Sequence, residues 1–187
     1  GNSCDGLHSG CFGSLNNMSA SAINSRVYGF GHTMTGAYSS SDGERNTVSG
    51  DHSNSSGNSN QVYGDYTSAC GQSTKTHGSH SFVSVNSNNA TSSYSTTSGQ
   101  GNTSNGQYST IAGRDNTVDF FGGYSSAAGR NNTISGAYSS VCGQNNSITG
   151  LHSFACGQDD NVAGLHSVAM GFHANAANNG SFVFADD

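Results

Sequence analysis

The chain has 187 residues and a formal net charge of −6, with 32% hydrophobic and 9% charged residues. Globular domains have roughly 45–50% apolar and about 25% charged residues. This composition therefore excludes a conventional helical or doubly wound enzyme, which needs Leu, Ala, Glu and Lys for its helices. The five cations Arg26, Arg45, Lys75, Arg114 and Arg130 are scattered, so we expect no nucleic-acid surface. No apolar run is long enough for membrane insertion.

Glycine recurs every seven residues over most of the chain, with lapses at Val85 and Ser92. Two sevens make a 14-residue unit that reads roughly G-x-x-N-x-V-x-G-x-Y/H-S-x-A-x, as in residues 129–142. Units 13–29 and 113–129 are two residues longer. An insertion that recurs at one place predicts a turn that faces solvent, and a repeat at fixed period predicts a solenoid.

Four residues before each unit-closing glycine there is a hydroxyl residue, and two residues after that a small or β-branched residue. The hydroxyl column contains Ser9, Ser25, Ser39, Ser53, Thr67, Ser81, Ser95, Ser109, Ser125, Ser139, Ser153, Ser167 and Ser181. The small-residue column contains Cys11, Val27, Ser41, Ser55, Ala69, Val83, Thr97, Ile111, Ala127, Val141, Ala155, Ala169 and Val183. Spacing by two is strand periodicity. These columns therefore predict one short strand per unit.

A third column, five residues after each unit-opening glycine, is mostly apolar and predicts a second strand per unit. It contains Met18, Met34, Val48, Val62, Thr76, Ala90, Ser104, Val118, Ile134, Ile148, Val162 and Ala176. We therefore predict an all-β, parallel β-solenoid of about thirteen 14-residue coils with two short strands per coil. The register is expected to continue through the less regular stretch from Thr74 to Ser104.

A column of asparagines predicts an amide ladder, in which stacked side chains bond to one another or to the turn backbone. It contains Asn16, Asn46, Asn60, Asn88, Asn102, Asn116, Asn132 and Asn146.

The residue just before the hydroxyl column is Tyr or His in eleven coils, with Asn24 as the exception. The ring column contains His8, Tyr38, His52, Tyr66, His80, Tyr94, Tyr108, Tyr124, Tyr138, His152 and His166. We expect these rings on the strand face opposite the core, pointing out of the roll. Two interpretations remain open. The rings line an axis where three rolls meet, which we favour, or they form an exposed ladder on which a glycan stacks.

Other chemistry finds little support in the sequence. Glu44 is the only glutamate and Lys75 the only lysine, and no paired carboxylates or nucleophile motif can be placed. We therefore expect no enzymatic activity and no cofactor. Three copies each of His152 and His166 at a trimer axis could bind a metal, but hydrogen-bonded interface rings are the interpretation we favour, so we expect no metal.

The five cysteines are Cys4, Cys11, Cys70, Cys142 and Cys156. Cys142 and Cys156 stack in one column, but parallel side chains that point the same way suit a bridge poorly. We therefore expect free thiols that act as small apolar fillers, as in a protein assembled in a reducing compartment.

The unit, with its Ser-x-Ala-x-Gly and Asn-x-Val/Ala-x-Gly halves, resembles the head repeat of YadA-like trimeric autotransporter adhesins. It is also similar to repeats in fibre proteins of phages and large DNA viruses. The resemblance runs from about Gly6 to Val183, and the closing Gly-Ser-Phe-Val-Phe-Ala-Asp is similar to the exit of such rolls. It implies a left-handed β-roll in residues 1–171, a last coil and exit segment toward a C-terminal region in 172–187, and three rolls side by side as a homotrimer.

The resemblance also implies a non-enzymatic attachment or receptor-binding head that binds a host-surface receptor or glycan. The cysteines, unusual in bacterial adhesin heads, favour a fibre on a virion surface over a bacterial outer surface. A structural fibre spacer is the alternative function, and an ice-binding solenoid is a weaker one because Thr is irregular. Asp119, Phe120 and Phe121 form a candidate partner-binding turn; a local lid or a contact between protomers explains the same residues.

Overall fold

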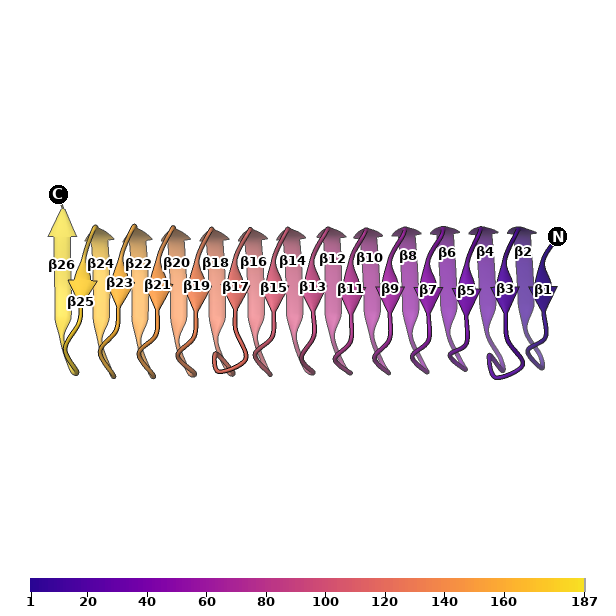
Figure 1. The fold of residues 1–187 in the computed structure, drawn as a ribbon, viewed down its shortest axis with the longest axis horizontal. Coiled ribbons are helices and arrows are strands. Elements are labelled where there is room, and N and C mark those ends of the chain that lie inside the picture. The colour runs from indigo at the N-terminus through magenta and orange to yellow at the C-terminus, as the bar shows by residue number, and fades with distance from the viewer. Residues whose placement is uncertain (187) are drawn as a thin grey trace. The chain divides into compact units, whose positions relative to one another are not determined.

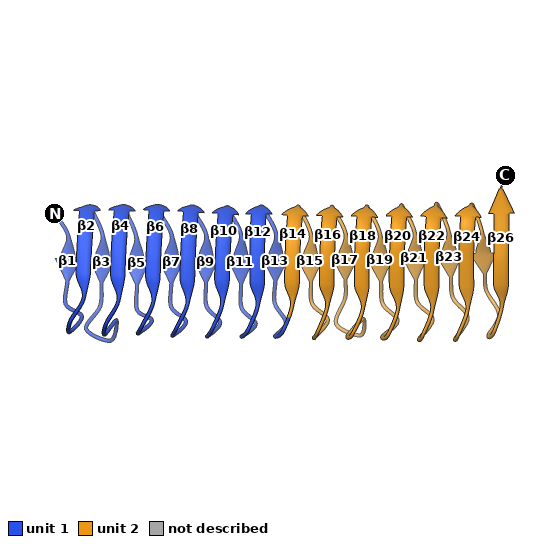
Figure 2. Cartoon of the chain, turned by 180° about the vertical axis from the view of Figure 1, so that it is seen from behind, with its two compact units in different colours: residues 1–94 blue, residues 95–187 orange. Residues whose placement is uncertain are grey.

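The computed structural model confirms the all-β solenoid (Figure 1). The structure describes residues 1–186, which form 26 strands and no helix, so none of these residues belongs to a helix that could span a bilayer. Strands of two and five residues alternate along the chain, and the strand pairs are parallel. The strands fall into two compact units, residues 1–94 and the residues from Ser95 onward (Figure 2).

In unit 1 the two-residue strands form one sheet and the five-residue strands form another. The short strands are β1 (Ser3–Cys4), β3 (Asn17–Met18), β5 (Thr33–Met34), β7 (Thr47–Val48), β9 (Gln61–Val62), β11 (Lys75–Thr76) and β13 (Asn89–Ala90). The long strands are β2 (Gly10–Ser14), β4 (Arg26–Phe30), β6 (Ser40–Glu44), β8 (Asn54–Asn58), β10 (Ser68–Gln72) and β12 (Phe82–Asn86).

Unit 2 repeats this arrangement. Its short strands are β15 (Thr103–Ser104), β17 (Thr117–Val118), β19 (Thr133–Ile134), β21 (Ser147–Ile148), β23 (Asn161–Val162) and β25 (Asn175–Ala176). Its long strands are β14 (Thr96–Gln100), β16 (Thr110–Arg114), β18 (Ser126–Arg130), β20 (Ser140–Gln144), β22 (Phe154–Gln158), β24 (Val168–Phe172) and β26 (Phe182–Asp186).

Within each unit, every coil stacks in register on its neighbour, usually 14 residues away. Val141 pairs with Ala127 and Ala155, and the step grows to 16 residues at the insertions, where Thr110 pairs with Ser126. In the less regular stretch the register holds within unit 1, because Gly71 pairs with Val85. In-register stacking places like residues in columns, and the predicted core columns are buried. Each unit therefore has its own apolar core, one around Met34 and Val48 and the other around Ile134 and Ile148.

Two columns of buried polar side chains complete this thin core. Ser139 Oγ donates to Gly150 O at 3.1 Å and accepts the N–H of Ser153 at 3.1 Å. Asn132 Nδ2 donates to Ala128 O at 3.0 Å and to Gly143 O at 2.9 Å, while its Oδ1 accepts the N–H of Asn146 at 3.0 Å. Because buried polar groups are stable only when hydrogen-bonded, these ladders let 32% hydrophobic residues suffice. The predicted amide ladder is confirmed.

The glycine period follows from close approach between coils. A Cβ on Gly143, which has φ +105°, would lie 1.9 Å from Gly157 O of the next coil, and a Cβ on Gly129 would lie 2.0 Å from Gly143 O. Only glycine fits such an approach without displacing backbone. Val85 takes the same place in unit 1 at φ +82°, an outlying conformation for a β-branched residue.

The expectation of free thiols is wrong for four of the five cysteines. Disulfides join Cys4 to Cys11 and Cys142 to Cys156, and Cys70 alone is free. Cys142 and Cys156 are register partners, and stacking sets their Cα atoms 4.6 Å apart, inside the range that a disulfide spans. Side chains that point the same way at this spacing bring their sulfurs together. The expectation that parallel side chains would not form a disulfide was wrong for this reason.

The predicted exit segment continues the solenoid. β26 pairs with β24 through Val168 and Phe182 in the register of the preceding coils. Asp187, the last residue of the predicted segment 172–187, lies outside the described residues. The division at residue 171 stays a prediction.

Candidate binding face

The Tyr and His rings lie in the turn that precedes each long strand, not on the strand face that the sequence suggested. Each ring residue has a positive φ near 55°, for example 56° at Tyr138 and 55° at His152. The left-handed turn directs the side chain away from the roll, and the described Tyr rings of this column are 45–57% exposed. The predicted outward direction is therefore right, but a turn rather than a strand pleat produces it.

The rings stack from coil to coil into one ladder in each unit. Ladder 1 consists of Tyr38, His52, Tyr66, His80 and Tyr94, with ring centroids 4.8–5.1 Å apart. Ladder 2 consists of Tyr108, Tyr124, Tyr138, His152 and His166, with centroids 4.7–5.0 Å apart. His8 stands apart from ladder 1, because Asn24 occupies the coil between His8 and Tyr38.

The ladders contribute little net stability. A left-handed backbone costs a residue with a Cβ roughly 1–2 kcal/mol. Tyr138 stacks on two neighbours, and each stacked pair adds about 0.5–1.5 kcal/mol when well buried. Tyr138 is half-exposed, so the lower values apply and the two effects nearly cancel. Stability alone therefore does not explain why rings rather than Gly or Asn fill this turn in almost every coil.

The hydroxyl groups of several Tyr rings are available to bind a ligand. Within residues 1–186, no hydrogen bond engages the hydroxyls of Tyr38, Tyr66, Tyr124 and Tyr138. A phenolic hydroxyl on an apolar ring gives one side chain both apolar and polar contact surface. Such side chains suit a ligand that also has apolar and hydrogen-bonding groups.

The candidate partner-binding turn lies beside ladder 2. Phe120 and Phe121 are 77% and 74% exposed, and their rings meet edge to face at 5.5 Å. Asp119 holds the turn, since its Oδ1 accepts the N–H of Phe121 at 3.1 Å. The two Phe rings, with Tyr124 and Tyr138, line an open hollow of about 310 Å³. The sequence predicted both features but gave no sign of their proximity, which depends on the direction of the inserted turn.

The amide ladder contains two titratable residues that the sequence reasoning missed. His32 Nε2 lies 3.1 Å from Tyr28 O and 2.9 Å from Gly43 O, so Nε2 carries the hydrogen and takes the place of the Asn amide. Asp160 accepts the N–H of Ala174 through Oδ1, but its buried Oδ2 has no partner within the described residues. Burial raises the pKa of Asp160. Counting 14 residues from Asn146 would have placed Asp160 in this column.

The sequence also raised a metal site and an ice-binding surface. No three His, Cys, Asp or Glu side chains in this part of the chain come close enough to hold a metal ion. A threefold site at His152 and His166 needs other copies of the chain and stays a hypothesis. Paired hydroxyls occur at Thr33 and Thr35 and in the next coil, and again at Ser147 and Thr149 and in the coil before, but Gln61 and Tyr63 take these positions elsewhere, so the hydroxyl array is irregular.

A scan against models of protein families finds no match, and a search of curated proteins finds none. The fold and the ring ladders are therefore the basis of the functional proposal.

Proposed function

We propose that this chain is a non-enzymatic attachment module of a surface fibre and that its ring ladders bind a saccharide on the surface to which it attaches. The observation that carries the proposal is the pair of half-exposed, five-ring ladders, which occupy costly left-handed turns without a matching gain in stability. The resemblance to trimeric fibre heads and to fibre repeats of phages and large DNA viruses adds the proposals that three copies assemble and that the fibre belongs to a virion. The paired cysteines give no support to assembly in a reducing compartment.

The chemistry of the ladder fits a saccharide better than a protein partner. A pyranose has a face of C–H groups that packs on an aromatic ring and a rim of hydroxyls that bond to polar edges. The rings repeat every 4.7–5.1 Å with their faces against one another. A chain of sugars can therefore meet successive ring edges and hydroxyls along a ladder, and a ring face only where the stack ends. The hollow beside Phe120 and Phe121 adds two exposed rings that an end unit could reach.

The test is binding to a panel of immobilised neutral oligosaccharides of glucose, galactose and N-acetylglucosamine. The double variant Tyr124→Ser with Tyr138→Ser removes the two rings that also line the Phe hollow. We expect it to weaken binding about tenfold, since each stacked ring contributes about 0.5–1.5 kcal/mol. Tyr63→Ser is the control, because Tyr63 is exposed and stacks on His77 at 4.8 Å outside the ladder.

Solution mass by light scattering completes the test. A wild-type mass near three times 19.0 kDa with saccharide binding intact supports a fibre whose ladders face outward. A mass that falls to one chain in the ladder variant, with no saccharide bound by the wild type, would show that the ladders join copies instead. Equal loss of binding in the Tyr63→Ser control would also contradict the proposal.

A further inference from the structure

We propose that the missing rung at Asn24 is a binding site for one carboxylate-bearing sugar ring, held between His8 and Tyr38 and paired with Arg26. This inference rests on the proposed function, because it assigns a ligand class to the same ladder face. It concerns unit 1 alone. Its evidence is an open hollow of about 550 Å³ lined by these four residues among others, within the usual size range of ligand pockets.

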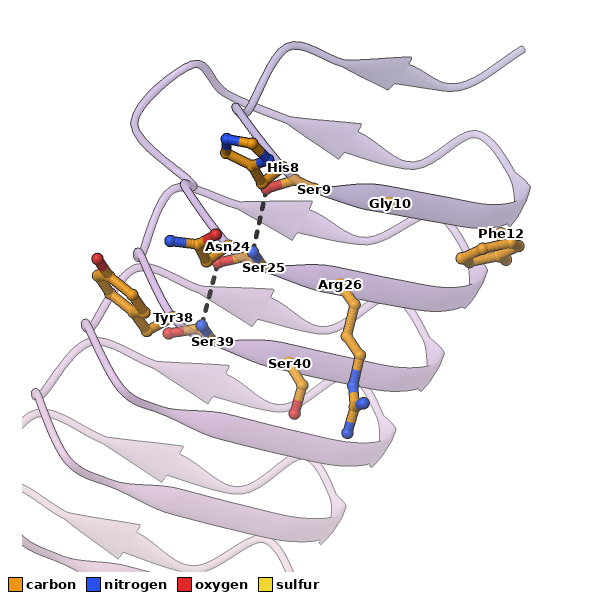
Figure 3. A pocket seen from close by; sticks show the side chains of 10 residues that line it. All are labelled: His8, Ser9, Gly10, Phe12, Asn24, Ser25, Arg26, Tyr38, Ser39 and Ser40. Carbon is orange, nitrogen blue, oxygen red and sulfur yellow. Dashed lines mark hydrogen bonds between the residues drawn. The ribbon is translucent and has the colours of Figure 1, made fainter.

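The hollow exists because the ring column is interrupted. Asn24 has the left-handed backbone of the column, with φ 53°, but a short amide side chain. Figure 3 shows His8, Asn24 and Tyr38 on three successive turns, with the Asn24 amide between the two rings. Tyr38 stacks on His52 at 4.9 Å on its other side. Its face toward Asn24 therefore has no ring against it.

Unit 2 shows what fills this position elsewhere. Both 16-residue units carry their insertion just before the ring column, and the equivalent of Asn24 is Tyr124. Tyr124 stacks at 4.7 Å on Tyr108 and at 4.9 Å on Tyr138. The missing rung thus leaves room for one further ring between His8 and Tyr38, and a ligand ring can occupy it.

Arg26 gives the hollow its charge preference. It begins β4 two residues after Asn24, is exposed, and forms no ion pair within residues 1–186, whereas Arg45 pairs with Glu44 and Arg114 with Asp115. Figure 3 shows its side chain extending along the sheet past Ser40. On the other side Gly10 occupies the same column, and the Phe12 ring lies over it, since a Cβ on Gly10 would be 3.1 Å from that ring. Phe12 is thus an apolar wall of the hollow next to Arg26.

The ligand class follows from these groups. A guanidinium pairs with a carboxylate through two parallel hydrogen bonds. A single cation on a chain of net charge −6 suits a ligand with one negative charge better than a polyphosphate. The Asn24 amide and the ring edges supply bonds for hydroxyls. A pyranose with one carboxylate, such as a uronic or sialic acid, meets all of these conditions.

The test compares glucuronate with glucose by NMR titration of the full chain. We expect glucuronate to bind at least about tenfold more tightly, as one charge-assisted pair allows. Arg26→Gln should abolish this preference. Asn24→Tyr should abolish the preference for glucuronate over glucose while the fold persists, because it fills the hollow with the usual residue of this column and leaves the ladders intact. Arg130→Gln is the matched control, an exposed arginine on the long-strand face of unit 2, and should bind as the wild type does.

The outcomes separate this inference from the proposed function. Glucuronate binding that is unchanged in Arg26→Gln and Asn24→Tyr, or that is lost equally in Arg130→Gln, would overturn the inference. If neutral oligosaccharides fail to bind while glucuronate binds with dependence on Arg26, the inference stands and the ladder function fails. If neutral oligosaccharides bind and glucuronate shows no preference over glucose, only the inference fails.

Discussion

At the scale of single residues, the residues that replace Asn in the buried amide column differ in how many of its hydrogen bonds they preserve. His32 preserves them by donating from Nε2 and accepting at Nδ1 from Ser41 at 2.9 Å. Asp160 preserves only half of them. Its neighbour Asn146 donates Nδ2 to Cys142 O at 2.8 Å and to Gly157 O at 3.0 Å, and a carboxylate has no hydrogen to donate.

Asp160→Asn should therefore stabilise the protein, and the gain should depend on pH. Burial raises the pKa of Asp160, with the charge of Asp159 acting in the same direction and the Ala174 N–H and His173 opposing it. Above the ordinary value of 3.8, the folded state binds more protons than the unfolded chain, so wild-type stability falls as pH rises through this window. The variant should gain about 1–3 kcal/mol at pH 7 and less near pH 4.

Chemical denaturation at both pH values measures this gain. Asn146→Asp, one coil earlier in the same column, is the control and should lose stability at neutral pH. A gain for Asp160→Asn that is equal at both pH values would show that burial does not raise the pKa of Asp160.

At the scale of the element, most coils combine a buried hydroxyl that stabilises with a neighbouring exposed ring that does not. Ser139 is buried and bonds to two other coils, whereas Tyr138 is half-exposed in a left-handed turn. Adjacent residues of one turn therefore have opposite roles, and substitution can separate them.

Tyr138→Gly should change the free energy of unfolding by less than about 1 kcal/mol, since relief of the left-handed backbone offsets the lost stacking. Ser139→Ala should cost about 1–3 kcal/mol, because it leaves the Gly150 carbonyl and the Ser153 N–H without their partner. Thermal and chemical denaturation of both variants measures the difference. A larger loss of unfolding free energy for Tyr138→Gly would show that the ladder stabilises the fold.

The disulfides give a second prediction at this scale. Alkylation of the folded protein without reductant should label Cys70 alone, and all five cysteines should react after reduction and unfolding. Reduction should lower stability by up to about 3 kcal/mol for the 14-residue loop between Cys142 and Cys156. Mass spectrometry counts the labels, and labelling of Cys142 in the unreduced protein would contradict the pairing. A double Cys142→Ser, Cys156→Ser variant controls for effects of reductant elsewhere.

At the scale of the molecule, backbone ladders and columns of like side chains supply the stability, and charge contributes little. The three ion pairs within residues 1–186 join side chains that are 32–64% exposed. Exposed pairs contribute about 0–1 kcal/mol each.

The melting temperature should consequently change by only a few degrees between low salt and roughly 1 M sodium chloride. Calorimetry at several salt concentrations measures it, with sucrose in place of salt as a control for general solute effects. A steep fall in melting temperature with salt would mean that charge pairs hold the coils together.

The sequence predicts most of this architecture because the repeats of the chain can be aligned with one another. Columns such as Ser139 and Ser153 reveal strand period, register and burial without any structure. Features that depend on atomic geometry rather than on the pattern of residue types were not predictable in the same way. The pairing of Cys142 with Cys156 depends on a Cα separation of 4.6 Å, the left-handed turn at Tyr138 on backbone geometry, and the hollow at Asn24 on a side chain that is missing.

The in-register step of 14 residues has a consequence for how such a gene can change. Each coil bonds only to the coil before and the coil after it, and every coil offers its neighbours the same backbone groups. An in-frame duplication or loss of one repeat during replication thus adds or removes one complete coil without altering any bond elsewhere. We expect natural variants of this chain to differ by whole repeats, so that the number of coils varies among them.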